Sequence, residues 1–349
     1  MIKRLSLISA LLLLINCSSR DQIQPYERTR VMMDTFVQIS IYDQNRPVKE
    51  LEQIVDLAFK RIEEIDRITN NYDESSFISL VNREAGKNAI ALDTVLYELI
   101  IASDSVYKLS DGAFDITIET VKRLWNFTQD NPRIPGDSLL QLKLQWVGTH
   151  HIKIDNYNIR FNSPEVKIDL GAIAKGYAID QAIQVLTENG ITDAMVNGGG
   201  DLRTICSDLT TGKRRVWIKH PRKPDVLFGY FKMDEGSVAT SGDYERYFTY
   251  DSVRYHHILD PKTGYPAREC VSVTITAPGA TEADGLATAV FVLGHERGLE
   301  LIERLPDVEG IIIFEKQGKL DWKASSGLRK KIKISKKFTT ATLILQQGV

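Results

Sequence analysis

The sequence predicts an α+β fold, because its strands, hairpins and helices do not alternate regularly as they do in a doubly wound sheet. Helix-periodic apolar runs occur near the start, the middle and the end of the chain. Two segments, at residues 151–161 and 246–259, look like β-hairpins. No internal repeat and no linker rich in Pro, Gly or Ser divides the 349 residues, so the chain forms one large domain or two small ones.

The first residues have the form of a signal peptide. Two basic residues precede an apolar run from Leu5 to Ile15, which is shorter than the roughly 20 residues that a transmembrane helix needs. Cys17 follows, and a polar stretch comes after it, as in bacterial lipoproteins. We therefore expect a signal peptide over residues 1–17, a lipidated Cys17, a tether over 18–28, and an inner-membrane anchor facing the periplasm. A plain secretory signal or an uncleaved anchor is the alternative.

The charge balance gives no indication of a nucleic-acid partner. The formal net charge is -2, and the short basic run from Arg329 to Lys337 is most simply a solvated segment. Besides Cys17, the chain has only Cys206 and Cys270, which either form one disulfide or stay reduced.

The first half of the chain reads as a strand followed by mainly helical segments. Apolar periodicity and the turn residues between the runs define these elements. We expect a strand over 30–43, a helix from Pro47 to Ile65, a polar loop over 70–82, a helix over 96–107, a loop over 131–136, a short helix over 138–144 and a hairpin over 151–161.

The second half alternates strands and helices around glycine-rich turns. We expect a strand over 166–168, a helix from Ala174 to Leu186, a strand over 193–196, a hairpin over 246–259, a buried strand over 271–277, a helix pair split by Gly294, a strand over 310–314 and a basic tail.

The stretch from Val166 to Asp180 predicts a strand, a tight turn and a helix start. Unpaired N–H groups at a helix start favour an anion, and Lys175 adds a positive charge one turn in. Asp169 stands where the strand ends. The alternative is an ordinary crossover, in which Asp169 caps the helix and Lys175 is solvated.

A run of glycines, NGGGD at Asn197 to Asp201, follows the next strand. Consecutive glycines let several backbone N–H groups face one point, which suits a phosphate. The run lacks the spacing of a dinucleotide fingerprint or a P-loop, so a wide turn is the alternative.

Asp284 and Thr288 lie four residues apart on a predicted helix, so their oxygens project from one face. A hard cation such as Mg²⁺ accepts a carboxylate, a hydroxyl and backbone carbonyls. The alternative is a capping box of Thr281 and Asp284, with Thr288 bonded back to its own helix.

His256 and His257 are adjacent on a strand, so one should face inward and the other outward. An inward histidine beside a phosphate is a candidate general base, although a strand histidine is more often simply packed. Ser241 lies in a turn that could line the same cavity.

Together these stretches resemble the ApbE family, the FAD:protein FMN transferases, from about Met33 to Phe314. The resemblance implies an ApbE-like, T-fold-related mixed body around one FAD cleft, with a domain over 29–330 and a tail over 331–349. It rests on the stretches KIDLGAIAKGYAID, VNGGGD, ATSGDYERY, HHILDPKTGYP and EADGLATA, and on the shorter MMDTF, YDESSFISLVN and DGAFD.

The resemblance also implies the chemistry. With Mg²⁺ bound, FAD is the substrate, and a threonine or serine hydroxyl of an acceptor flavoprotein attacks the FMN phosphorus while AMP leaves. The acceptor is expected to be a membrane redox subunit or an FMN-carrying domain. The alternatives are an FAD pyrophosphatase, in which water replaces the hydroxyl, and a lipoprotein that binds FAD without chemistry.

The family's functional residues transfer to this chain position by position. Mg²⁺ is expected on the Asp284 carboxylate, the Thr288 hydroxyl and the carbonyls of Ala172 and Ala287, and His257 is expected to deprotonate the acceptor. The expected FAD contacts are Met33, Tyr72, Ala113, Phe114, Asp115, Asp169, Lys175, Asn197, Gly198, Gly199, Asp201, Ser241 and Ile258.

Overall fold

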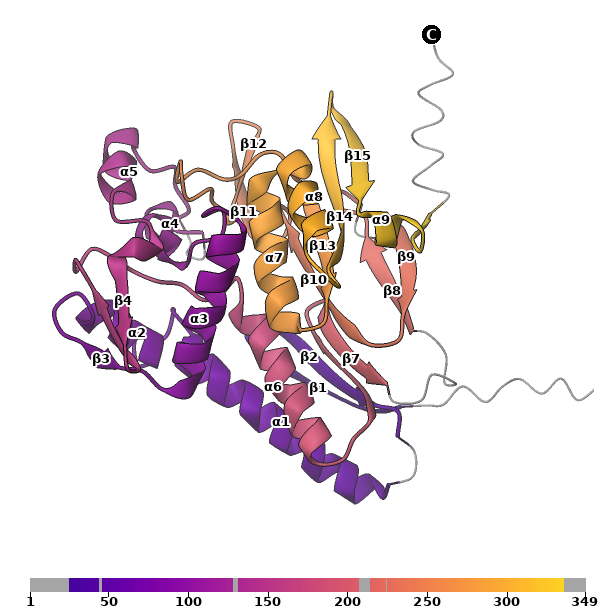
Figure 1. The fold of residues 1–349 in the computed structure, drawn as a ribbon. Coiled ribbons are helices and arrows are strands. Elements are labelled where there is room, and N and C mark those ends of the chain that lie inside the picture. The colour runs from indigo at the N-terminus through magenta and orange to yellow at the C-terminus, as the bar shows by residue number, and fades with distance from the viewer. Residues whose placement is uncertain (1–24, 44–45, 128–130, 207–213, 224, 336–349) are drawn as a thin grey trace, which may run out of the picture.

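The computed structural model describes residues 25–43, 46–127, 131–206, 214–223 and 225–335. A large sheet of eight antiparallel strands forms the centre of the fold, in the order β1-β2-β6-β7-β10-β13-β14-β15 (Figure 1). The predicted α+β class is confirmed. These strands are β1 (Tyr26–Met32), β2 (Thr35–Ile41), β6 (Asp193–Gly198), β7 (Asp201–Cys206), β10 (Gly236–Gly242), β13 (Ser272–Ala277), β14 (Glu309–Lys316) and β15 (Lys319–Ala324).

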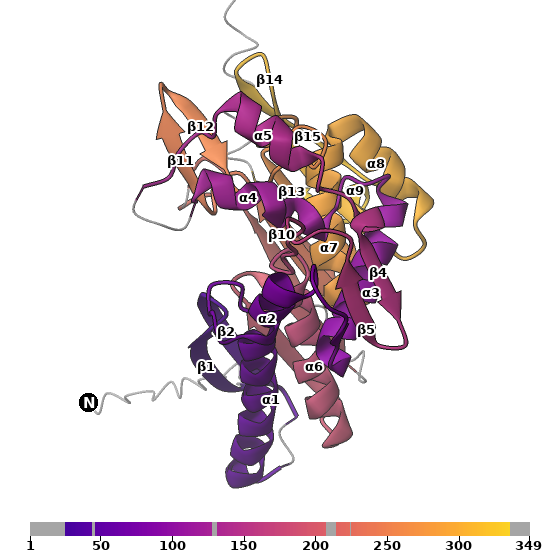
Figure 2. The same cartoon turned by 90° about the vertical axis from the view of Figure 1, so that its left-hand side faces the viewer.

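Helices cover one face of the large sheet, and Figure 2 shows the long α1 beside α6 from a second direction. The helices of this layer are α1 (Val48–Thr69), α3 (Thr94–Leu109), α6 (Ala174–Glu188), α7 (Ala280–Leu293) and α8 (His295–Arg304). The shorter helices are α2 (Phe77–Glu84), α4 (Glu119–Trp125), α5 (Asp137–Leu144) and α9 (Ser326–Arg329).

Three small sheets complete the described structure. One of them, β16-β9-β8, packs on the face of the large sheet opposite the helices. Their strands are β3 (Ile90–Ala91), β4 (Ile152–Asp155), β5 (Asn158–Phe161), β8 (Arg214–Lys219), β9 (Leu227–Met233), β11 (Tyr247–Tyr250), β12 (Val253–His256) and β16 (Lys333–Ile334).

The apolar run in β14 shows that the large sheet is buried on both faces. Ile312 packs into the core under the helices. Its neighbours Ile311 and Ile313 point the other way and pack against Val216 and Ile218 of β8. Because side chains alternate across a strand, a strand buried on both faces must be apolar at every position.

The helix predicted from Pro47 corresponds to α1, and the one predicted from Ala174 corresponds to α6. Both predictions used the 3.6-residue spacing, and the apolar positions of that spacing are buried. In α1 they are Leu51, Ile54, Val55, Ala58, Phe59, Ile62 and Ile65.

Three predicted elements were wrong. The single strand expected over 30–43 is the hairpin of β1 and β2, because Met33 and Asp34 adopt positive φ angles and turn the chain back. The other two errors are linked by one side chain. Val166 and Ile168 are buried, but residues 166–168 form no strand, because the Asn82 side chain takes the place of a neighbouring strand. Its Oδ1 accepts from the Ile168 N–H at 2.7 Å, and its Nδ2 donates to the Ile168 carbonyl at 2.8 Å. Asn82 lies on α2, in the segment predicted to be a loop, where the Ser76 hydroxyl caps the helix by accepting from the Ser79 N–H.

Helices α6 and α7 approach closely at Gly176. A Cβ added there would lie 2.2 Å from the Ala280 carbonyl oxygen and 2.9 Å from the Asp284 Cβ. The site described below depends on this close approach, because it brings the start of α6 against Asp284.

Replacing Gly176 by alanine is therefore expected to destabilise the protein by about 2–4 kcal/mol, because two helix backbones must move apart. Urea denaturation would measure the change in the free energy of unfolding. Gly136→Ala is the matched control, since a Cβ at that position meets nothing within 4 Å. Equal stability of the two variants would contradict the expectation.

The predicted leader over 1–17, with Cys17, lies outside the described residues. In the described ranges, no helix is long and apolar enough to cross a membrane. No disulfide joins Cys206 and Cys270.

Candidate active site

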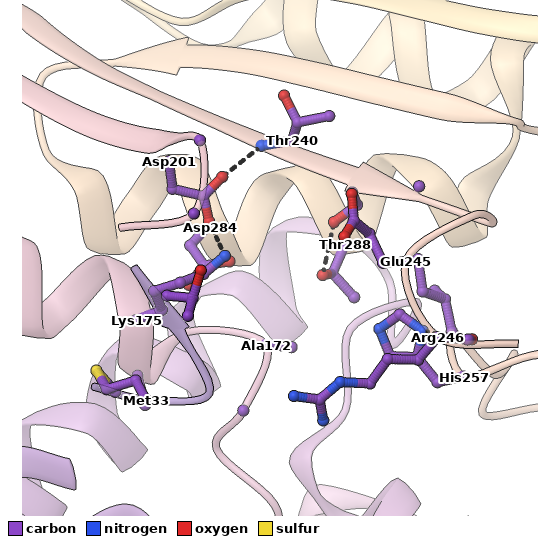
Figure 3. Close-up of a pocket in the computed structure, with 18 of the residues that line it drawn as sticks. Met33, Ala172, Lys175, Asp201, Thr240, Glu245, Arg246, His257, Asp284 and Thr288 are labelled. Atoms are coloured by element: carbon purple, nitrogen blue, oxygen red, sulfur yellow. Dashed lines mark hydrogen bonds and ion pairs between the residues drawn. The ribbon is translucent and has the colours of Figure 1, made fainter. Parts of the chain in front are cut away.

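One cavity of about 820 Å³ lies where the large sheet, the start of α6 and the segments on either side of the hairpin β11–β12 meet. Its volume is in the range of ligand pockets. Figure 3 shows Lys175, Asp201 and Asp284 on one side of this cavity and Glu245, Arg246 and His257 on the other.

The start of α6 is fixed by two carboxylates. Asp284 Oδ2, on α7, accepts a hydrogen bond of 2.9 Å from the Gly176 N–H. Lys175 forms an ion pair with Asp201, and Asp201 Oδ1 accepts from the Thr240 N–H at 2.8 Å. Burial opposes the charge on Lys175, but the carboxylates of Asp201 and Asp284 outweigh it and raise the pKa of that ammonium group.

The glycine run forms the tight turn between β6 and β7. Gly199 and Gly200 have positive φ angles of 67° and 109°, which explains why glycine stands there. Their N–H groups are already used, because Gly199 donates to the Phe36 carbonyl and Gly200 to Asn197 Oδ1. The expectation that these N–H groups face a phosphate was wrong. Gly199 and Gly200 line the cavity with backbone atoms instead.

The metal donors expected from the sequence lie partly on this cavity. Asp284, Thr288 and Ala172 line it, and the Thr288 hydroxyl is 3.1 Å from the Ser241 hydroxyl. The alternative capping box is absent, since Thr281 donates to Asp180 at 2.6 Å and α7 begins after Gly279. A carboxylate, a hydroxyl and a backbone carbonyl are a set of hard oxygen donors that fits Mg²⁺.

Asp284 carries a buried negative charge with incomplete compensation. Burial raises its pKa to about 7, the Lys175 charge offsets part of this rise, and Asp201 adds to it. In the described residues, no group of three or more His, Cys, Asp or Glu side chains could hold a metal. A cation at this position would therefore depend on hydroxyl and carbonyl donors as well as on the one carboxylate.

The raised pKa of Asp284 predicts a stability change in metal-free protein. A carboxyl group with a folded-state pKa near 7 and a usual value of 3.8 is disfavoured by folding once it is ionised. The free-energy cost of burying the ionised Asp284 carboxylate on folding therefore grows as pH rises from about 4 through 7, and it is fully present at pH 8. Asp284→Asn, which can still accept from Gly176, should raise the free energy of unfolding at pH 8 by roughly 1–4 kcal/mol, and by much less at pH 5.

Urea denaturation in EDTA at both pH values would measure this difference. A variant that is less stable than the wild type at pH 8 would show that the carboxylate stabilises the metal-free fold.

His257 lies on the opposite wall, directly after β12. Its Nδ1 is 3.2 Å from the Arg246 carbonyl oxygen, which can only accept, so Nδ1 carries the hydrogen and Nε2 keeps a lone pair. Burial, and then the nearby charge of Lys122, lower the pKa of His257 to about 3. The imidazole is therefore neutral at physiological pH and able to accept a proton.

Lys122 is a charged residue of this cavity that the sequence did not indicate. It forms an ion pair with Asp169. Burial would raise the pKa of Asp169, but the charge and hydrogen bond of Lys122, together with the Gly171 N–H, hold it below its usual value. Lys122 lies on α4 and Asp169 in the segment that leads into α6, so only the tertiary fold brings them together.

Met33 and Asp115 also line the cavity, and hydrogen bonds hold both residues in place. Met33 has a positive φ of 50° in the β1–β2 turn, and its N–H donates to Asp66 Oδ2 at 3.2 Å. Burial raises the pKa of Asp115 to about 6, although Asp115 accepts from the Thr117 N–H and hydroxyl.

The cavity brings together most residues that the sequence singled out. Ala287 is buried within α7, and neither Ala287 nor Gly198 lines the cavity. His256 points away and bonds to the Ala267 carbonyl at 2.7 Å. Those that line it are Met33, Tyr72, Ala113, Phe114, Asp115, Asp169, Ala172, Lys175, Asn197, Gly199, Asp201, Ser241, His257, Ile258, Asp284 and Thr288.

Several lining residues were not singled out in advance. The whole of β8 except its first residue lines the cavity, and its sequence carries no motif. Glu245 and Arg246 lay within one of the quoted stretches, ATSGDYERY, so a closer reading of that motif could have found them.

A family model with the description "ApbE family" matches residues 33–312 of the chain. The chain belongs to the ApbE family. Among similar proteins of this family is the FAD:protein FMN transferase of Treponema pallidum (strain Nichols), 30% identical over 319 residues, which are 86% of this chain and 87% of that protein. The FAD:protein FMN transferase of Vibrio cholerae (strain O395) is 30% identical over 303 residues, which are 85% of this chain and 89% of that protein.

Solved ApbE structures share the fold. The ApbE protein of Thermotoga maritima has a TM-score of 0.80 and 34% identity, covering 88% of this chain and 99% of that one. The flavin transferase ApbE of Vibrio cholerae has a TM-score of 0.78 and 28% identity, again covering 88% and 99%.

Proposed function

We propose that the protein is an FAD:protein FMN transferase, which moves FMN from FAD to a threonine or serine hydroxyl of an acceptor flavoprotein. The observation that carries this proposal is the cavity itself. It combines a hydroxyl and a carboxylate on one face of α7, a cationic side chain at the start of α6 and a neutral histidine opposite them. Family membership and the names of the relatives support the same activity.

In the proposed reaction, the acceptor hydroxyl oxygen forms a bond to the FMN phosphorus. The bond between that phosphorus and the AMP oxygen breaks, and AMP leaves. His257 takes the hydroxyl proton on Nε2, the ring nitrogen that the hydrogen bond to the Arg246 carbonyl leaves without a hydrogen. The phosphate charges of FAD favour the protonated imidazole, so they raise the pKa of His257 during the reaction.

Lys175 and Lys122 lie at different parts of the cavity and have different roles in this proposal. Lys175 faces the pyrophosphate, while its bond to Asp201 fixes its position between β7 and α6. Lys122 and Asp169 form the pair next to His257. The start of α6 contributes less than the sequence suggests, because its Gly176 N–H donates to Asp284 and not to a ligand.

Mg²⁺ is proposed on the oxygens of Asp284, Thr288 and the Ala172 carbonyl. When bound, it would neutralise charge on the pyrophosphate and on the departing AMP. The buried carboxylate of Asp284, with its raised pKa, is the part of the site that such a cation would compensate.

An assay of AMP release separates this proposal from its alternatives. The soluble part of the protein, from residue 18, is incubated with FAD and Mg²⁺, with and without an apo FMN-carrying domain. AMP release that requires the domain supports the transferase. Equal release without the domain would identify an FAD pyrophosphatase, and FAD that binds but stays intact would identify a flavin carrier.

We also propose that the mature protein is anchored by a lipid on Cys17 to the periplasmic side of a bacterial inner membrane. The sequence pattern over residues 1–17 supports this. Cys17→Ser should shift the full chain from the membrane to the soluble fraction, or leave it with an uncleaved leader. Unchanged mass and fractionation would rule out the anchor.

A further inference from the structure

One wall of the cavity has no part in the chemistry proposed above. Five consecutive residues of β8 line it, from Arg215 to Lys219. Successive side chains of a strand point to opposite faces, so a run of consecutive lining residues means that the strand turns its edge to the cavity.

β8 is an edge strand. In the described part of the chain it pairs with β9 alone, so one row of its backbone N–H and C=O groups has no strand partner. The other edge strands of the described sheets contribute no residue to the cavity. They are β1, β15, β16, β3, β4, β11 and β12.

The exposed side chains of β8 alternate with its buried ones. Val216 and Ile218 pack into the core, whereas Arg215, Trp217 and Lys219 are exposed. The Trp217 side chain is 48% exposed, with its ring centroid 4.7 Å from that of Tyr230. Charged residues on an edge strand can simply prevent aggregation, but an exposed tryptophan works against that purpose.

The two cationic side chains of this face are available to a partner. Arg215 lies over the Tyr230 ring at 5.5 Å, and among the described residues neither Arg215 nor Lys219 forms an ion pair with a carboxylate. With Trp217 between them, they form a short surface of positive charge and aromatic area at the rim of the cavity. This surface is complementary to an extended segment that carries acidic side chains.

We propose, building on the proposed transferase function, that the acceptor polypeptide binds along the β8 edge as an added strand. The acceptor must bring a serine or threonine hydroxyl into the same cavity that holds the FMN phosphorus, and a strand laid on the β8 wall does this. Backbone hydrogen bonds to the edge supply affinity, while acidic side chains facing Arg215 and Lys219 supply selectivity.

Hydrogen exchange tests the position of the bound segment. The probe is an apo FMN-carrying domain whose modified threonine is replaced by valine, added to the FAD-loaded protein with Mg²⁺. Backbone amides of residues 214–219 should exchange more slowly with the probe than with FAD alone. Bound probe with no protection of this segment would overturn the proposal.

A charge-reversal pair tests the surface in the reaction. Arg215→Glu with Lys219→Glu should raise the acceptor concentration for half-maximal transfer by about tenfold. FAD affinity and the rate at saturating acceptor should change little. Lys316→Glu with Lys319→Glu is the matched control, because it reverses two exposed charges where β14 turns into β15, away from the cavity.

The outcomes separate the two proposals. If the wild type transfers FMN and both double variants behave alike, the β8 proposal is wrong and the transferase stands. If the Arg215 and Lys219 variant loses as much affinity for FAD as for the acceptor, β8 belongs to the FAD site and the β8 proposal is wrong. If the wild type transfers nothing to any acceptor, both proposals fail.

Discussion

Replacing Asp284 by asparagine is expected to lower the rate of FMN transfer roughly a thousandfold or more, because the proposed Mg²⁺ site would then lose its only carboxylate. Asparagine has nearly the same shape and can still accept from the Gly176 N–H, so α6 and α7 should stay in place. Mg²⁺ should raise the unfolding temperature of the FAD-loaded wild type and leave that of the variant unchanged.

Glu282→Gln is the matched control for this change. It removes a carboxylate from the same helix, but Glu282 does not line the cavity. Its transfer rate should stay within about twofold of the wild type, as is usual for a substitution away from a site. Asp284→Asn protein that transfers FMN at the wild-type rate would remove Asp284 from the metal site.

Replacing His257 by alanine is expected to slow transfer by about 10²–10⁴-fold, the usual contribution of a general base. FAD binding should persist, because the other cavity residues remain. In the free enzyme the pKa of His257 is lowered to about 3, so the imidazole stays neutral, and able to act as a base, until pH falls towards that value. The acid limb of kcat/KM should therefore not show a histidine titrating near 6.5.

The neighbouring histidine provides the comparison. His256 is 3% exposed, and burial lowers its pKa to about 4, but it faces away from the cavity and bonds to the Ala267 carbonyl. His256→Gln should reduce stability and leave kcat close to that of the wild type. Transfer assays and urea denaturation of both variants would measure this contrast, and full activity in His257→Ala would exclude His257 as the base.

The fold was largely predictable because burial follows periodicity in most elements. The apolar spacing in α1 and α6 identified both helices, and the turn residues placed the hairpin of β11 and β12. The prediction of a strand at 166–168 was wrong because the apolar pattern indicates burial but not hydrogen bonding to another strand. A side chain on α2, Asn82, bonds to its backbone, and no local pattern could show that.

The candidate site was predictable where ordered motifs carry it and unpredictable where tertiary contacts create it. The order of the quoted stretches pointed to Asp284, Thr288 and His257, which now line one cavity. Lys122 has no motif and reaches Asp169 only through the packing of α4 against the segment before α6. The glycine run was wrongly predicted to present free N–H groups, because Gly199 donates to Phe36 on the neighbouring strand β2 and Gly200 donates to Asn197 within the turn.

The intact mass of an acceptor domain shows whether the protein transfers FMN. An apo FMN-carrying domain is incubated with FAD, Mg²⁺ and either wild-type protein or Asp284→Asn. We expect the domain to gain the mass of one phosphoester-linked FMN with the wild type, and the gain to disappear with the variant or with EDTA. An acceptor of unchanged mass in the presence of active, FAD-consuming wild type would contradict this expectation.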